Sequence, residues 1–250
     1  MEPYPDFVML AESIRLCDMA YETDDARARK AFQDAGYIVL GRYSDYEAQA
    51  VALLDHTNEQ LLVISGTRVS EGNIFERIVD VTEDLAQLLP PDQVGVNAFV
   101  ASGCHMRANR IWDHLGPVFN PLIKIKMMGH SLGADTTHVM PTIMPKDMIQ
   151  GLIAWEPPKA ASIGYWTGYG WPNPNYITVI NGHDWWAAWP WNDVNFQDLT
   201  HPLGPVLWLH DGTWEWITAD KWQGDRKHSS DHDSAKISSI VAALRDSTHG

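Results

Sequence analysis

The chain has 250 residues, of which 45% are hydrophobic and 20% are charged, and its net charge is −14 at neutral pH. This composition is typical of a globular protein with a sizeable core, and the negative charge argues against nucleic acids and anionic membranes as partners. No apolar run approaches the ~20 residues of a membrane-spanning helix, and the N-terminus lacks the basic start of a signal peptide. We therefore expect no stable membrane insertion and, by default, a cytoplasmic location.

Hydrophobic periodicity predicts the elements of the N-terminal half. Residues 7–35 carry apolar side chains at helical spacing, with a break near residues 21–25, and Gly36 is a typical helix end. Short apolar or alternating runs predict strands over residues 37–43, 48–55 and 61–65. A further helix is predicted over residues 95–115.

The C-terminal half alternates predicted strands with predicted helices. The strands fall at residues 122–128, 150–155, 176–180 and 205–210, with a helix starting at residue 134, a long loop over 157–174 and a terminal helix over 231–245. This alternation predicts a single α/β domain over residues 1–250, in which a mostly parallel central sheet has helices on both faces.

The motif Gly129-His130-Ser131-Leu132-Gly133 lies between a predicted strand and a predicted helix. Strand, Gly-x-Ser-x-Gly and helix form the context of a nucleophile elbow. The serine of such an elbow sits on a tight, strained turn, and side chains two residues to either side would collide with the neighbouring strand and helix. The first N–H groups of the helix can stabilise an oxyanion. We therefore predict that Ser131 is a nucleophile.

A serine nucleophile needs a histidine base and a carboxylate, which follow the serine in the order acid, then histidine, in α/β-hydrolases. Asp184 comes directly after the predicted strand 176–180, so it lies at the same edge of the sheet as Ser131. His232 precedes the terminal helix and is expected to face that edge, with His210 as the second candidate. The remaining candidates are Asp193, Asp198, His201 and His228.

Several blocks, taken in order, resemble the class 3 lipases, an α/β-hydrolase family of triacylglycerol lipases and related esterases. The strand-end Arg-Gly-Thr/Ser of that family is similar to Ser65-Gly66-Thr67, and its Asp-Trp-x-x-Asp-Leu block is similar to residues 80–85. The serine motif, Asn181-Gly182-His183-Asp184 and Asp231-His232 follow in the family's order. The resemblance extends over residues 7–245.

The resemblance implies a serine carboxylic-ester hydrolase in which Ser131, Asp184 and His232 are nucleophile, acid and base. It implies an oxyanion hole made by the backbone N–H groups of Thr67 and Leu132, a structural role for His201, and ester or lipid substrates without a metal or cofactor. Residues 68–89 would form a lid whose apolar side chains, Ile74, Phe75 and Ile78, contact lipid at an interface. A stripe this short also fits an ordinary packed helix.

Two other classes of function remain open from the sequence. A metal-dependent hydrolase could take its ligands from His183, Asp184, His210, Asp211 and residues 228–233. A hydrolase-fold protein without catalytic activity could act by binding or as a structural protein, although the ordered serine, aspartate and histidine argue against it.

The tryptophans, the two cysteines and Asp135 lead to three further predictions. The chain has 12 tryptophans, and their cluster at residues 185–191 predicts either an aromatic core or an apolar wall for the substrate. Cys17 and Cys104 lack a metal-type spacing, and we expect buried free thiols in preference to a disulfide. Asp135 falls in the first turn of the helix after Ser131, where a carboxylate is electrostatically favourable and lies near the nucleophile.

Overall fold

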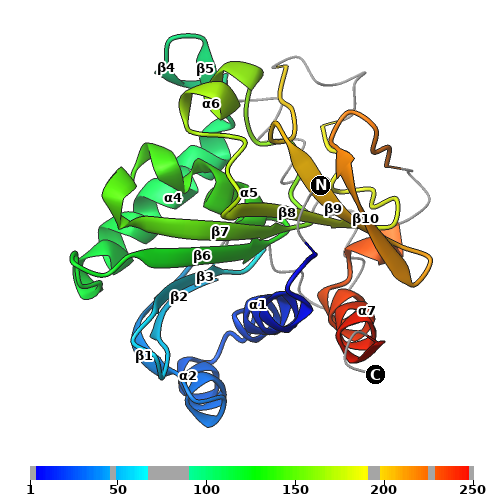
Figure 1. The fold of residues 1–250 in the computed structure, drawn as a ribbon. Helices are drawn as coiled ribbons and strands as arrows, with labels where there is room; N and C mark the ends of the chain where they lie inside the picture. Colours follow the sequence, from blue (N-terminus) through cyan, green and yellow to red (C-terminus); the bar gives the residue numbers. More distant parts are fainter. Residues whose placement is uncertain (1–3, 46–48, 67–89, 191–197, 225–228, 248–250) are drawn as a thin grey trace.

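The computed structural model describes residues 4–45, 49–66, 90–190, 198–224 and 229–247. Its centre is an eight-stranded sheet with the order β1-β2-β3-β6-β7-β8-β9-β10 (Figure 1). The strands from β3 to β9 in this sheet run parallel, and β1, β2 and β10 add antiparallel pairs at its two sides. The strands are β1 (Ile38–Ser44), β2 (Gln49–Leu54), β3 (Gln60–Ile64), β6 (Ile125–His130), β7 (Ile149–Trp155), β8 (Tyr176–Asn181), β9 (Pro205–His210) and β10 (Thr213–Thr218).

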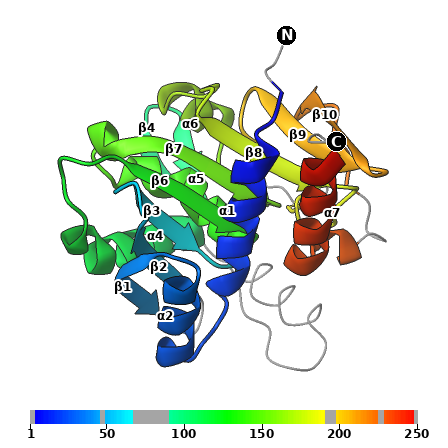
Figure 2. The same cartoon turned by 60° about the horizontal axis from the view of Figure 1, so that its bottom comes forward.

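Helices cover both faces of the sheet, as the sequence predicts (Figure 2). On one face lie α1 (Phe7–Met19), α2 (Asp25–Asp34) and α7 (Ser234–Ser247), and on the other lie α4 (Ser102–Leu115) and α5 (Leu132–Val139). The predicted break in the first helix is present, because Asp24 caps α2 by accepting a hydrogen bond from the N–H of Arg27.

The core lies in two layers, one on each face of the sheet. Leu62 and Ile64 of β3 join the apolar cluster under α4 and α5, whereas Leu61 and Val63 join the cluster under α1 and α7. This separation follows from the alternation of side chains along a strand, and it explains why the parallel strands are nearly continuous apolar runs.

Three details differ from the predicted elements. Residues 95–115 are not one helix, because β4 (Asp92–Gly95) and β5 (Ala98–Val100) form a hairpin before α4, with Asn97 in the left-handed region at its turn. The predicted loop 157–174 contains the short helix α6 (Ile163–Gly168). The strand β10 was not predicted, although Asp211-Gly212, both with positive φ, is a typical two-residue hairpin turn.

Short 3-10 turns complete the described chain at Gly116–Val118, Met140–Thr142, Lys146–Met148 and Ser229–His232. Cys17 and Cys104 are both free and buried, as expected. Within the described residues, no helix has the length and apolar character needed to span a membrane.

Two glycines allow β6, α5 and the end of β3 to approach closely. A Cβ atom on Gly129 would lie 2.3 Å from the carbonyl oxygen of Gly133. A Cβ atom on Gly133 would lie 2.4 Å from the carbonyl oxygens of both Ile64 and Ser65. Since these neighbours are backbone atoms of packed elements, no side chain fits at either position.

We expect Gly133→Ala to lower the free energy of unfolding by about 1–3 kcal/mol, the usual cost of forcing a methyl group into a packed site. Gly168→Ala at the end of α6 is the matched control, because a Cβ there would meet nothing within 4 Å. Denaturant unfolding of the two variants measures the difference. Equal stability of Gly133→Ala and the unmodified protein would contradict this steric argument.

Candidate active site

Ser131 occupies the sharp turn between β6 and α5. Its φ is +57° and its ψ is −131°, a backbone conformation that residues other than glycine rarely adopt. The turn is held from both sides, because the N–H of Ser131 donates to the carbonyl of Trp155 at 2.8 Å and its carbonyl accepts from the N–H of Ala134 at 2.8 Å. The strained conformation is therefore fixed by the end of β7 and by the first turn of α5.

Asp184 and His232 meet at the carboxyl end of β8. His232 Nδ1 lies 2.7 Å from Asp184 Oδ2, although the two residues are 48 positions apart in the chain. Asp184 is fully buried, and its carboxyl also accepts hydrogen bonds from the N–H groups of Trp186 at 3.0 Å and Ala187 at 3.1 Å. Burial would raise the pKa of Asp184, but His232 and the hydrogen bonds outweigh burial and lower that pKa below its ordinary value.

An ionised Asp184 fixes the proton of His232. A carboxylate can only accept, so Nδ1 of His232 donates to Asp184, and in a neutral imidazole Nε2 then carries the lone pair. Nε2 is buried and has no hydrogen-bond partner among the described residues. A neutral imidazole with a free Nε2 is the form that can accept a proton from a serine hydroxyl.

The loop that carries His232 is attached to the end of β8. The side-chain amide of Asn181 donates to the carbonyl of Asp231 at 2.9 Å, and the N–H of His183 donates to Asp231 Oδ2 at 3.2 Å. Lys236 in α7 forms an ion pair with Asp231 Oδ1 at 2.7 Å. Asn181 and Asp231 thus hold His232 and Asp184 at one edge of the sheet.

A chain of hydrogen bonds runs from His232 through His130, the residue before Ser131, to the end of β3. His130 Nε2 donates to the carbonyl of His232 at 3.1 Å, so His130 Nδ1 accepts from the Tyr21 hydroxyl at 2.7 Å. The N–H of Gly66 in turn donates to that hydroxyl at 3.0 Å. Burial, reinforced by His232, lowers the pKa of His130 to about 3, so this histidine stays neutral.

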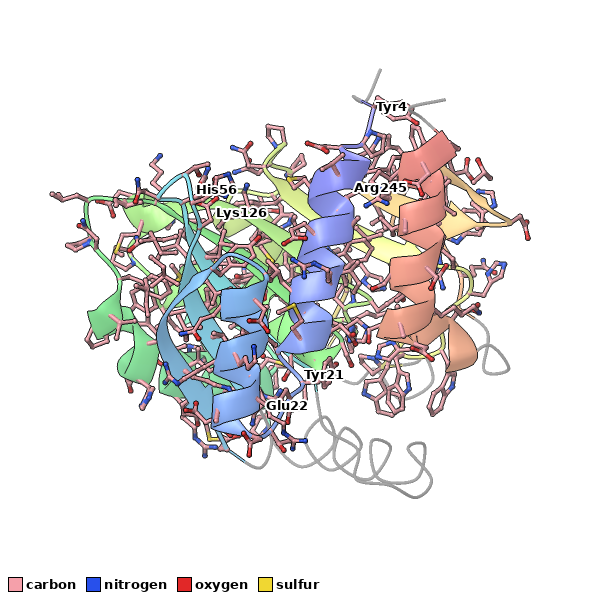
Figure 3. All side chains as sticks on the ribbon, turned by 90° about the horizontal axis from the view of Figure 1, so that it is seen from below. Tyr4, Tyr21, Glu22, His56, Lys126 and Arg245 are labelled. Carbon is pink, nitrogen blue, oxygen red and sulfur yellow. The ribbon has the colours of Figure 1, made fainter. Side chains whose placement is uncertain are left out.

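Tyr21 and Gly66 bring the start of the predicted oxyanion loop against Ser131. Tyr21 follows α1, which crosses the sheet beside α7 (Figure 3). A Cβ atom on Gly66 would lie 2.7 Å from the Cβ of Ser131, which shows how closely the end of β3 approaches this serine. Leu132 is the first residue of α5, so its N–H has no acceptor within the helix.

Glu156 is a second buried carboxyl at this site that the sequence analysis did not single out. It follows β7 with a φ of +51° and is fully buried, and its Oε1 accepts from the N–H of Asn181 at 2.5 Å. Ligand atoms of Glu156, Asp184 and His232 lie within 4.8 Å of one another. Burial and the neighbouring Asp184 raise the pKa of Glu156 well above its ordinary value. Asp184 is therefore the ionised member of the pair and Glu156 the neutral one.

Neither of the other described histidine candidates hydrogen-bonds to Asp184, although His201 lies close enough to interact with its charge. His210 stacks on Trp208 and pairs with Asp211 and Glu215. His201 is buried with its ring edge-on to Trp222, and Asp198 is exposed. The remaining predicted residues lie outside the described residues: Thr67, Ile74, Phe75, Ile78, Asp193 and His228.

Of the ligands predicted for a metal, Asp184 and His232 come together, whereas His228 lies outside the described residues. Among the described residues, the one group of three candidate ligands is Glu156, Asp184 and His232. Two of these ligands, Asp184 Oδ2 and His232 Nδ1, already share a hydrogen bond.

Comparison with solved structures identifies the fold of this chain. Neither a family model nor a curated protein sequence matches this chain. The mono- and diacylglycerol lipase of Aspergillus oryzae superposes with a TM-score of 0.67 at 16% identity, over 96% of this chain and 100% of that one. The Lip2 lipase of Yarrowia lipolytica superposes with a TM-score of 0.64 at 13% identity, over 94% and 91% of the two chains.

A third structure agrees with these two. The triacylglyceride lipase of Rhizomucor miehei superposes with a TM-score of 0.64 at 15% identity, over 92% of this chain and 94% of that one. The chain therefore has the α/β-hydrolase fold of the fungal class 3 lipases, as the sequence resemblance predicts.

The neutral Glu156 predicts a pH-dependent stability. Because its pKa is higher in the folded protein than its ordinary value of 4.5, the folded state binds the extra proton and loses stability as pH rises above about 4.5. Glu156→Gln keeps the acceptor for Asn181 and cannot ionise. We expect its melting temperature, relative to the unmodified protein, to rise by about 2 °C or more between pH 5 and pH 8, as ~1 kcal/mol produces in a chain of this size.

Asp113→Asn on the exposed side of α4 is the control for removing a carboxyl elsewhere in the protein. The pKa of Asp135 is also raised, but Asp135 is present in every protein compared. Its contribution to the pH dependence therefore cancels when melting temperatures are compared. A pH-independent difference for Glu156→Gln would show that Glu156 is ionised in the folded protein.

Proposed function

We propose that this protein is a serine carboxylic-ester hydrolase of the lipase or esterase type, acting through an acyl-enzyme on Ser131. The observation that carries the proposal is the 2.7 Å hydrogen bond between His232 and the buried Asp184, at the sheet edge where Ser131 sits in its strained turn. The fold shared with lipases supports it, since these structures include enzymes named for acylglycerol hydrolysis.

The proposed first step is acylation. Nε2 of His232 removes the proton of the Ser131 hydroxyl while Oγ attacks the ester carbonyl carbon. The carbonyl oxygen becomes an oxyanion, stabilised by the N–H groups of Leu132 and Thr67. His232 then passes the proton to the leaving alcohol as the C–O bond breaks, and Asp184 stabilises the imidazolium in between.

Deacylation repeats the sequence with water. His232 takes a proton from water, the hydroxide oxygen attacks the acyl carbonyl, and Ser131 Oγ leaves with that proton as the acid is released. The substrates are esters or lipids, and residues 68–89 with Ile74, Phe75 and Ile78 are proposed, from sequence alone, as a lid over the acyl site.

We expect Ser131→Ala to lower kcat for ester hydrolysis by about 10⁴–10⁶-fold, because only binding and oxyanion stabilisation remain. Hydrolysis of p-nitrophenyl butyrate and labelling by a fluorophosphonate measure the loss. Ser239→Ala on the exposed side of α7 should keep full activity and labelling.

Two results would reject this mechanism. Loss of activity in EDTA, restored by zinc, would favour a metal-dependent hydrolase. No ester hydrolysis and no fluorophosphonate labelling of the unmodified, folded protein would favour a binding or structural protein.

The base and the acid are tested by a second set of variants. Asp184→Asn and His232→Ala should each lower kcat by about 10⁴-fold, and the double variant should be little worse, because the residues act as one unit. His210→Ala is the matched control and should keep activity within a few-fold, since its partners are Asp211 and Glu215. An inactive His210→Ala beside an active His232→Ala would reverse the assignment of the base.

A further inference from the structure

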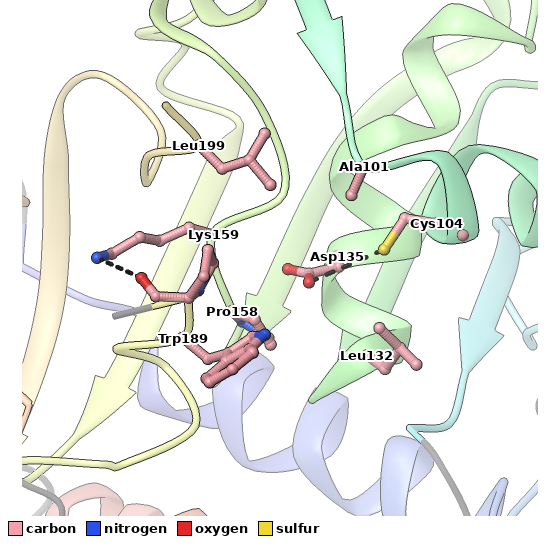
Figure 4. A pocket seen from close by; sticks show the side chains of 10 residues that line it. Ala101, Cys104, Leu132, Asp135, Pro158, Lys159, Trp189 and Leu199 are labelled. Atoms are coloured by element: carbon pink, nitrogen blue, oxygen red, sulfur yellow. Dashed lines mark hydrogen bonds between the residues drawn. The ribbon is translucent and has the colours of Figure 1, made fainter. Parts of the chain in front are cut away.

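A cavity of about 50 Å³ opens next to the nucleophile. Most of its lining is apolar, including Ala101, Leu132, Trp189 and Leu199 (Figure 4). Leu132 is adjacent to Ser131, and Asp135, which also lines the cavity, is bonded through its N–H to the carbonyl of Ser131 at 3.3 Å. The cavity thus begins one residue from the nucleophile and reaches a carboxyl one helical turn further along α5.

The carboxyl of Asp135 is buried without adequate partners. Only 3% of the residue is exposed, and Oδ1 has no hydrogen-bond partner in the described part of the chain. Oδ2 lies 3.9 Å from the thiol of Cys104, which is a weak donor. A buried polar group that lacks partners is costly, so its presence in an otherwise apolar lining calls for a reason.

The charged groups around Asp135 do not compensate the cost of burying its carboxylate. Burial raises the pKa of Asp135 well above its ordinary value, against the opposing effects of Arg107 and Cys104. The sequence-based expectation of an electrostatically favourable carboxylate is therefore wrong, because burial outweighs the helix terminus. Lys159 also lines the cavity, but its ammonium is directed away from Asp135 and donates to the carbonyl of Pro190 at 3.0 Å (Figure 4).

We propose that this cavity is an acyl subsite that selects acyl groups bearing a hydroxyl over unsubstituted alkyl groups of the same length. The inference rests on the proposed esterase function and names its substrate class. A hydroxyl donates and accepts, so it matches a neutral carboxyl that does both, while the apolar lining contacts the methylene groups. An ammonium fits less well, because it would have to leave water for a cavity lined mostly by apolar groups.

The test compares dissolved methyl esters in two pairs, 3-hydroxybutanoate with butanoate and 6-hydroxyhexanoate with hexanoate. The measured quantity is the ratio of kcat/KM for the hydroxylated ester to kcat/KM for the plain ester, each corrected for its rate of hydrolysis by hydroxide. In the unmodified protein we expect a ratio of about 10 or more for at least one pair, since a subsite with an unmet polar group discriminates against a ligand that cannot bond to it.

Variants of Asp135 separate the carboxyl from the shape of the cavity. Asp135→Ala should bring the ratio to about 1, and Asp135→Asn, whose amide still donates and accepts, should keep most of the preference. Ile163→Ala, at an exposed position of α6 outside the cavity lining, is the control and should leave the ratio unchanged. If Asp135→Ala does not fold, Asp135→Leu provides the same comparison with an apolar side chain of similar length.

The outcomes distinguish this inference from the proposed function. The same ratio in the unmodified protein and in Asp135→Ala overturns the subsite while leaving the esterase intact. Fluorophosphonate labelling of Ser131 without hydrolysis of any of the four esters also overturns the subsite. Absence of both labelling and hydrolysis rejects the proposed function, and the subsite with it.

Discussion

The close contact of α5 with β6 and the end of β3 is the constraint on which the site depends. Gly129 and Gly133 remove the two side chains that would separate these elements, and the backbone between them is forced into a left-handed turn at Ser131. The same contact brings Gly66 against Ser131. A packing requirement of the core therefore fixes the strained turn at Ser131 and sets the position of the first helical N–H groups.

The remaining groups are held by connections between segments far apart in the chain. His130 links the turn to the carbonyl of His232, and Tyr21 links His130 to Gly66. Asn181 and Asp231 attach the loop that carries His232 to the end of β8, next to Asp184. Each link is a directional hydrogen bond in a partly buried setting, so these loops are held in position against the sheet.

Three buried carboxyls near the site have different protonation states for a common physical reason. Asp184 is ionised because His232 and backbone N–H groups compensate its burial. The N–H of Asn181 does not outweigh the burial of Glu156, and Arg107 and Cys104 do not outweigh the burial of Asp135, so the pKa of both carboxyls is raised. Of these three carboxyls only Asp184 is negatively charged beside His232, which suits the proposed role of His232 as a base that becomes positively charged.

Local periodicity and glycine spacing are enough to predict the α/β class, the serine motif and the strand end near Asp184. The place of His232 before the terminal helix also indicates this residue. The pairing of Asp184 with His232 and not with His210, the contacts of Tyr21 and Glu156 with the site, and the position of Asp135 in a cavity lining follow from the folded structure alone. These outcomes depend on contacts between residues distant in the chain and on burial, and burial sets protonation in a way that no local pattern encodes.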